Sequence, residues 1–134
     1  MHILTGKELR EHHFLICKLE ELQKIKNSLI YYRNDAEKES LNGDSLSEID
    51  RNIEIIEKEI CELSPKIEET NNLINKNISA FSDNTAKNVG KMHYIEGLPW
   101  DIIAEKLKLG TTEAIKSRFK REMQKLRICK LQKG

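Results

Sequence analysis

Apolar residues recur every three or four positions along most of the chain, which is the spacing of one face of an α-helix. The longest such pattern runs from Leu46 to Phe81, where one apolar position returns every seven residues. Its members are Leu46, Ile53, Ile60, Ile67, Ile74 and Phe81, with Ile49, Ile56 and Leu63 in a second seam beside them. A heptad repeat sustained over this length predicts a coiled-coil helix.

The later part of this helix carries two irregularities. The second seam continues through Thr70 and Asn77, so the pattern predicts looser packing toward the end of the helix. Pro65 removes one backbone hydrogen bond and clashes with the carbonyl four residues before it. Either the helix kinks at 61–65, or it breaks there and Ser64 caps a new helix. Because the heptad phase runs straight through, we favour the kink.

An earlier stripe predicts another long helix, from about Gly6 to about Lys38. Its apolar members are Leu9, Leu15, Ile16, Leu19, Leu22, Ile25, Leu29 and Tyr32. Turn-forming residues at 40–44 then end the pattern. Both arms would be roughly 50 Å long at 1.5 Å per residue, which favours an antiparallel hairpin. Two helices bury only one seam, so we expect a homodimer or a higher homo-oligomer.

Residues 83–127 predict three shorter helices. The first spans about 83–95, and the second runs from Pro99, which is favoured in the first turn of a helix, to Leu107. The Lys-Leu-Gly sequence at 108–110 forms a tight turn, after which Thr111 or Thr112 can cap the third helix. A short helix, a turn with glycine and an amphipathic helix with a basic outer face follow one another in a helix-turn-helix.

The third of these helices carries the candidate functional residues. Ile115, Phe119, Met123 and Leu126 form its apolar face, and we expect Trp100 to pack the second helix against the first. The candidate DNA-binding residues are Thr111, Thr112, Glu113, Lys116, Ser117, Arg118, Lys120, Arg121 and Lys125. The early residues of such a helix read base edges in the major groove, while Lys and Arg further along neutralise phosphates.

Composition and charge support a helical protein with two dissimilar parts. Of 134 residues, 34% are charged, with two prolines and six glycines, which disfavours β-sandwiches and barrels. Residues 1–80 hold 11 Lys/Arg and 16 Asp/Glu and are acidic, whereas residues 81–134 hold 12 Lys/Arg and 6 Asp/Glu and are basic. A basic end suggests a polyanionic partner, and a solvated lysine-rich tail is the alternative. We therefore predict an all-α fold with an acidic hairpin, 1–81, and a basic helix-turn-helix domain, 82–134.

Other classes of function lack their signatures in this sequence. We expect no membrane association, because no apolar run approaches the roughly 18–20 residues of a span. The first residues do not have the order of a secretory signal, and three separated cysteines are typical of reduced thiols in a cytoplasm. His13 and Cys17 have helical ligand spacing but no further ligands nearby, so we expect no metal or cofactor. Without a nucleophile–base pair we expect no enzyme.

Residues 94–107 (YIEGLPWDIIAEKL) and 113–121 (EAIKSRFKR) resemble the region-four domain of bacterial sigma factors. With an acidic helical hairpin in front of it, the chain is similar to small phage and prophage transcriptional regulators of the RinA/ArpU type. The resemblance covers about a third of the chain and implies promoter binding in the cytoplasm of a bacterial host. It implies base-reading roles for Thr112, Glu113, Lys116 and Ser117, and backbone roles for Arg118, Lys120 and Arg121.

The sequence departs from the sigma pattern at two places. The turn is one residue longer, and Pro99 opens the second helix where the family has Ser or Thr. The leading hypothesis is a sequence-specific DNA-binding regulator that dimerises through its hairpin and binds double-stranded DNA. One alternative is a DNA-packaging subunit similar to a small terminase. The other is a protein-interaction module that binds host RNA polymerase.

Overall fold

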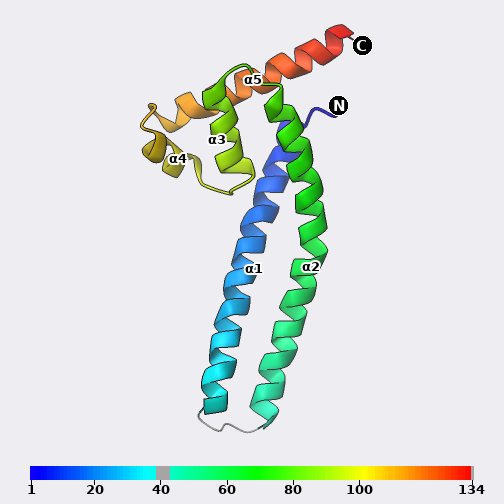
Figure 1. Ribbon diagram of the computed structural model, residues 1–134, viewed down its shortest axis with the longest axis vertical. Coiled ribbons are helices and arrows are strands. Elements are labelled where there is room, and N and C mark those ends of the chain that lie inside the picture. The colour runs from blue at the N-terminus through cyan, green and yellow to red at the C-terminus, as the bar shows by residue number, and fades with distance from the viewer. Residues whose placement is uncertain (39–42, 134) are drawn as a thin grey trace. The chain divides into compact units, whose positions relative to one another are not determined.

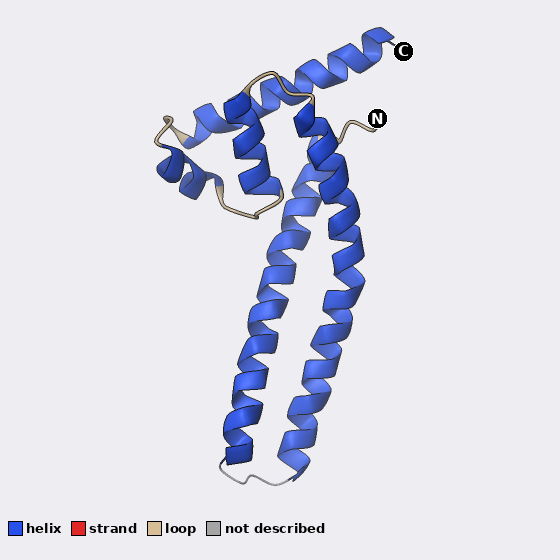
Figure 2. Ribbon diagram, viewed as in Figure 1, coloured by secondary structure: helices blue, strands red, loops and turns tan. Residues whose placement is uncertain are grey.

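The part of the chain that the structure describes forms five α-helices, which Figure 1 labels in chain order. The computed structural model describes residues 1–38 and 43–133, and within these ranges it contains no strand (Figure 2). In chain order the helices are α1 (Gly6–Lys38), α2 (Gly43–Ser79), α3 (Asn84–Tyr94), α4 (Trp100–Leu107) and α5 (Thr112–Lys133). The predicted all-α class is therefore confirmed. No helix in the described part of the chain has the length and apolar composition that a membrane span requires.

Packing divides the chain into two compact units. The larger unit contains Met1–Ile16 and Ile67–Gly134, and the smaller unit contains Cys17–Lys66. The larger unit thus combines α3, α4 and α5 with the beginning of α1 and the end of α2.

In the smaller unit, α1 and α2 run antiparallel. Lys26 Nζ lies 3.4 Å from a carboxylate oxygen of Glu57, and Arg33 forms an ion pair with Asp50. Moving forward along α1 from Lys26 to Arg33 corresponds to moving back along α2 from Glu57 to Asp50, which defines the antiparallel register. The predicted turn at 40–44 lies outside the described residues, apart from positions 43 and 44, which begin α2.

These ion pairs correct the apolar stripe that the sequence predicts for α1. Ile25 and Tyr32 belong to that stripe, but they are 41% and 63% exposed. Their neighbours Lys26 and Arg33 reach the partner helix instead. A stripe chosen by hydrophobicity alone misses such positions, because a charged residue can occupy a helix seam when an opposite charge faces it.

α2 continues without a break through Pro65, which excludes the broken-helix alternative. The hydroxyl of Ser64 does not cap a new helix. It donates a hydrogen bond of 2.7 Å to the carbonyl oxygen of Ile60, one turn back in the same helix. At this position the unbroken heptad phase therefore predicted the continuous helix correctly, although proline is a residue that can break one.

The end of α2 is the most deeply buried part of that helix, so the predicted loosening is wrong. Ile74, Asn77 and Ile78 are each 1% exposed, and Phe81, just after the helix, is 4% exposed. The Asn77 side chain accepts a hydrogen bond from the Leu4 N–H at 3.0 Å and donates one to the His2 carbonyl at 2.9 Å. A polar residue in the helix seam packs tightly here because backbone groups of the N-terminal segment satisfy its hydrogen-bonding groups.

Helices α3, α4 and α5 pack against one another within the larger unit (Figure 1). The carboxylate of Asp83 accepts the N–H groups of Thr85 and Ala86 and so caps the start of α3. Val89, Ile103 and Ile115 contribute one fully buried side chain from each of the three helices. The bounds of α3 and α4 lie within one residue of those predicted.

Candidate functional site

The turn between α4 and α5 sets where α5 begins. Lys108 adopts a left-handed conformation with φ of 52° and closes α4 by donating its N–H to the Ala104 carbonyl. Gly110 follows with φ of 111°, a conformation that side-chain-bearing residues rarely adopt. The hydroxyl of Thr111 then accepts the Ala114 N–H at 3.1 Å. Of the two predicted capping residues, Thr111 therefore caps α5.

The inner face of α5 is held by aromatic and aliphatic packing. Ile115, Phe119 and Met123 are at most 3% exposed. The Phe119 ring lies 5.5 Å from that of Phe81 and 5.1 Å from that of Tyr94, measured between ring centroids. This packing fixes the rotation of α5 about its axis, and hence which side chains point outward.

The outward side chains of α5 fall into two basic flanks with a ridge between them. The first flank carries Lys116, Lys120 and Arg127, and the second carries Arg118, Arg121 and Lys125. The ridge carries Glu113, Ser117 and Gln124, all exposed. Residues within each group are spaced three, four, seven or eleven positions apart, which places them on one side of a helix.

The nine predicted site residues take different positions in this arrangement. Lys120 and Arg121 are exposed, one on each flank, and Ser117 lies on the ridge between them. Thr111 is the cap and Thr112 is half-buried beside it. Lys116 Nζ lies 3.8 Å from the Glu113 carboxylate, one turn earlier in the helix. The helix therefore presents a mixed polar and basic surface over its first half.

The second flank is organised by two carboxylates. Arg118 Nε lies 3.4 Å from Asp83, and Lys125 Nζ lies 3.4 Å from Glu122. Glu122 is only 3% exposed, and one of its oxygens accepts the backbone N–H groups of Ser82 and Asp83 and the Ser82 hydroxyl. Burial alone would raise the Glu122 pKa, but these hydrogen bonds and Lys125 outweigh it and lower the pKa. Glu122 thus fixes α5 to the α2–α3 connection as a carboxylate.

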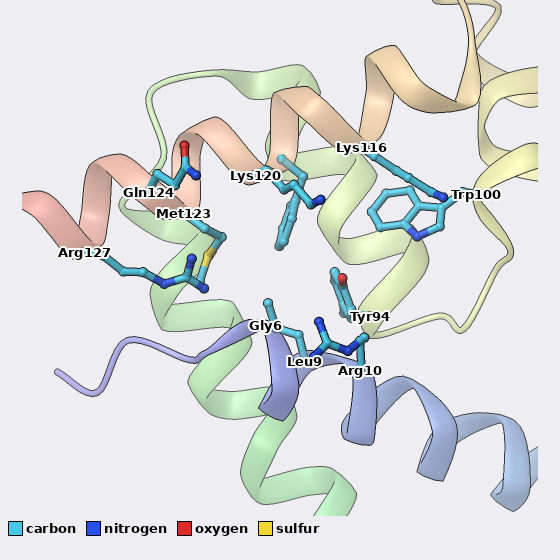
Figure 3. A pocket seen from close by; sticks show the side chains of 11 residues that line it. Gly6, Leu9, Arg10, Tyr94, Trp100, Lys116, Lys120, Met123, Gln124 and Arg127 are labelled. Atoms are coloured by element: carbon cyan, nitrogen blue, oxygen red, sulfur yellow. The ribbon is translucent and has the colours of Figure 1, made fainter.

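The first flank borders a cavity that has no Asp or Glu among the described residues that line it (Figure 3). Lys116, Lys120 and Arg127 line it from α5, and Arg10 lines it from α1. Arg127 also donates a hydrogen bond of 2.8 Å to the Leu4 carbonyl, which fixes its guanidinium at the rim. Neither Arg10 nor Arg127 was among the predicted site residues. Arg10 lies on α1, more than a hundred positions from Lys116 and Lys120, so no spacing within α5 could reveal it.

A stack of three rings joins α1, α3 and α4 beside this flank. The His93 ring stacks on His13 and on Trp100, with centroids 3.9 Å apart in both cases. Its Nδ1 donates to the Leu98 carbonyl at 2.7 Å. Burial lowers the His93 pKa to about 4. As expected, Trp100 holds α4 against α3, and the neutral His93 ring is part of that packing.

The chemistry that this surface offers is the binding of anions by ammonium and guanidinium groups. No group of three or more His, Cys, Asp or Glu side chains with the geometry of a metal site occurs among the described residues. Comparison with protein-family models, with curated proteins and with solved structures finds no match to the chain.

Proposed function

We propose that this protein is a sequence-specific DNA-binding transcriptional regulator of the phage type, with α5 as the helix that enters the major groove. The observation that carries the proposal is the arrangement of α5: basic flanks on both sides of a polar ridge, on a helix fixed by α3 and α4. In the proposal α4, the turn and α5 act as the helix-turn-helix. The function is one of binding, not of catalysis.

The shape and charge of a DNA groove support this assignment. The major groove is about 12 Å wide, so one α-helix with side chains fills it and has a phosphate backbone along each side. The first flank would face one backbone and the second flank the other. Glu113, Ser117 and Gln124 on the ridge then lie toward the base edges, where hydrogen-bonding side chains discriminate between base pairs.

The ion pairs of the second flank are compatible with phosphate contacts. The Arg118 and Lys125 side chains are 41% and 66% exposed although each has a carboxylate neighbour. A guanidinium carries five N–H donors, and one carboxylate contact leaves others for a phosphate. Asp83 and Glu122 therefore position these cations without removing them from the surface.

The proposed regulator self-associates through the smaller unit. Two helices alone leave much of their apolar surface uncovered: Ile30, Tyr31 and Ile55 are 37%, 70% and 51% exposed. A contiguous exposed apolar patch marks a surface that another chain covers, and the proposal takes these side chains to form such a patch in the dimer. A dimer would present two copies of α5 to two half-sites of an operator.

Fluorescence anisotropy with labelled duplexes from the DNA that flanks the gene tests this function. We expect site-selective binding that weakens with salt, because each phosphate contact releases a counterion. Arg121→Gln should weaken binding to all duplexes alike and reduce the slope of log K against log salt by about 0.9. Ser117→Ala should instead change the preference between duplexes.

The matched control is Lys58→Gln, which removes the same charge from an exposed position of α2 in the smaller unit and should leave binding unchanged. Failure of the wild-type chain to bind any duplex at low salt would overturn the proposal. If the triple variant K116E/R118E/R121E still captured RNA polymerase in a pull-down, the protein-interaction alternative would be favoured.

A further inference from the structure

The cavity beside the first flank lies entirely within the larger unit and has a volume of about 420 Å³. Three parts of that unit border it: the beginning of α1, the α3–α4 region and one side of α5 (Figure 3). A volume of this size is within the range of pockets that hold small organic molecules.

Four cationic side chains border the cavity, and none of the described residues that line it is acidic. They are Arg10, Lys116, Lys120 and Arg127. Arg127 is fixed by the Leu4 carbonyl, a neutral group that leaves its charge uncompensated. The Glu113 carboxylate approaches Lys116 at 3.8 Å from outside the cavity. Like charges gathered around one space repel one another, and an anion placed among them would relieve that repulsion.

The floor of the cavity is apolar. Tyr94, Trp100 and Phe119 line it, with the ring centroids of Tyr94 and Trp100 5.8 Å apart and nearly perpendicular. Leu9 and Met123 complete the floor and are at most 4% exposed. Aromatic side chains together with guanidinium and ammonium groups fit a flat apolar body that carries a negative group.

We propose that this cavity binds a small organic anion with an aromatic or similarly flat apolar body, bearing a carboxylate, sulfonate or phosphate. Lys116 and Lys120 belong both to the cavity rim and to the flank that contacts DNA in the proposed function. An anion held by these two lysines competes with a DNA phosphate for them. The regulatory part of this inference therefore rests on the proposed function, and the ligand acts as an effector that weakens DNA binding.

Titration of the full chain with 8-anilinonaphthalene-1-sulfonate, an aromatic sulfonate that fluoresces on apolar surfaces, tests the site. We expect saturable binding with one site per chain. Lys120→Gln and Arg10→Gln should each weaken it about fivefold or more, because each removes a rim charge. Arg121→Gln removes the adjacent charge on the opposite flank of α5 and should change the affinity less than twofold.

Unfolding curves of all three variants must match the wild type, since the dye also binds partly unfolded chains. Absence of saturable binding, or an equal effect of Lys120→Gln and Arg121→Gln, would overturn the site. An equal effect of the two substitutions would mean that the dye is attracted to the basic surface of α5 in general and not to this cavity.

A competition experiment separates the site from the proposed function. DNA that binds wild-type protein should displace the dye, and Arg10→Gln, which lies outside α5, should bind DNA normally while resisting inhibition by the dye. Dye binding with the expected variant pattern but without DNA binding would support the site and reject the DNA-binding function. Simultaneous binding of dye and DNA without mutual weakening would overturn the effector role.

Discussion

At the scale of single residues, the features that organise α5 are polar side chains in buried places. Glu122 is one of two acids in the basic stretch 106–134, and its position in the sequence gives no sign that it is buried. Its role depends on backbone N–H groups some 40 residues earlier in the chain. Asn77 is similar, because its partners His2 and Leu4 come from the opposite end of the hairpin sequence. Sequence patterns reveal the spacing of apolar and polar positions, but not which distant backbone groups form hydrogen bonds with a polar side chain.

The buried histidines predict a loss of stability in mild acid. Burial lowers the pKa of His93 to about 4 and also lowers that of His12, from an ordinary value of 6.5. The folded chain therefore binds fewer protons than the unfolded chain below pH 6.5. The contribution of these histidines to the free energy of unfolding is fully present above pH 6.5 and decreases as the pH falls toward 4.

Thermal unfolding followed by circular dichroism checks this pH dependence. The midpoint should be lower at pH 5 than at pH 7.5, and His93→Gln should reduce the difference. The Glu8 and Glu122 carboxylates also have lowered pKa values, but they lose their contribution only below about pH 4.5. The interval from pH 6.5 to 5 thus reports on the histidines, and equal midpoints at the two pH values would contradict the role given to His93.

At the scale of helices, periodicity and turn residues predicted the elements well. The heptad positions Ile67 and Ile74 of α2 are buried, and the Gly-containing turn before α5 and the apolar face of α5 also agree with the structure. The stripe of α1 was predicted less well, because Lys26 and Arg33 occupy seam positions that a hydrophobic criterion assigns to their neighbours. Two basic flanks on α5 are implicit in its sequence, but the cavity beside one of them depends on α1 and could not be predicted from α5.

The close approach of α3 to α5 makes Gly90 sensitive to substitution. A Cβ atom at Gly90 would lie 2.7 Å from a ring carbon of Phe119 and 3.0 Å from Ile78, both buried. We expect Gly90→Ala to lower the free energy of unfolding by about 1–2 kcal/mol, because overpacking exceeds the gain in helix propensity.

Urea unfolding of the Gly90→Ala variant and of a control measures this effect. Gly43→Ala is the control, since a Cβ atom there has no neighbour within 4 Å. It should change stability by about 0.5 kcal/mol or less. Wild-type or greater stability of Gly90→Ala would show that α3 and α5 do not approach as closely as described.

At the scale of the whole molecule, the described residues form two packing units, and each has a proposed task. The predicted domains, 1–81 and 82–134, assign self-association to the hairpin and DNA binding to the C-terminal helices. The larger unit also includes both ends of the hairpin, which supply Arg10 to the cavity and Asn77 to the core. Sequence periodicity cannot reveal this grouping, since it depends on contacts between residues more than seventy positions apart.

Light scattering tests the proposed self-association. The 15.6 kDa chain should behave as a dimer of about twice that mass. Replacing Tyr31 and Ile55 by Glu in one double variant should shift it to monomer, whereas Asn27→Glu on the exposed surface of the same unit should not. A wild-type monomer would contradict the proposal, and a ring of eight or more copies would favour the DNA-packaging alternative.

In the proposed function α5 binds DNA with its two flanks and ridge, and amide NMR of isotope-labelled protein tests this binding residue by residue. Addition of a binding duplex at low salt should shift the backbone resonances of residues 111–125 most strongly, with weak effects in residues 17–38 and 43–66. Shifts confined to the smaller unit, or spread evenly over the chain, would contradict the claim.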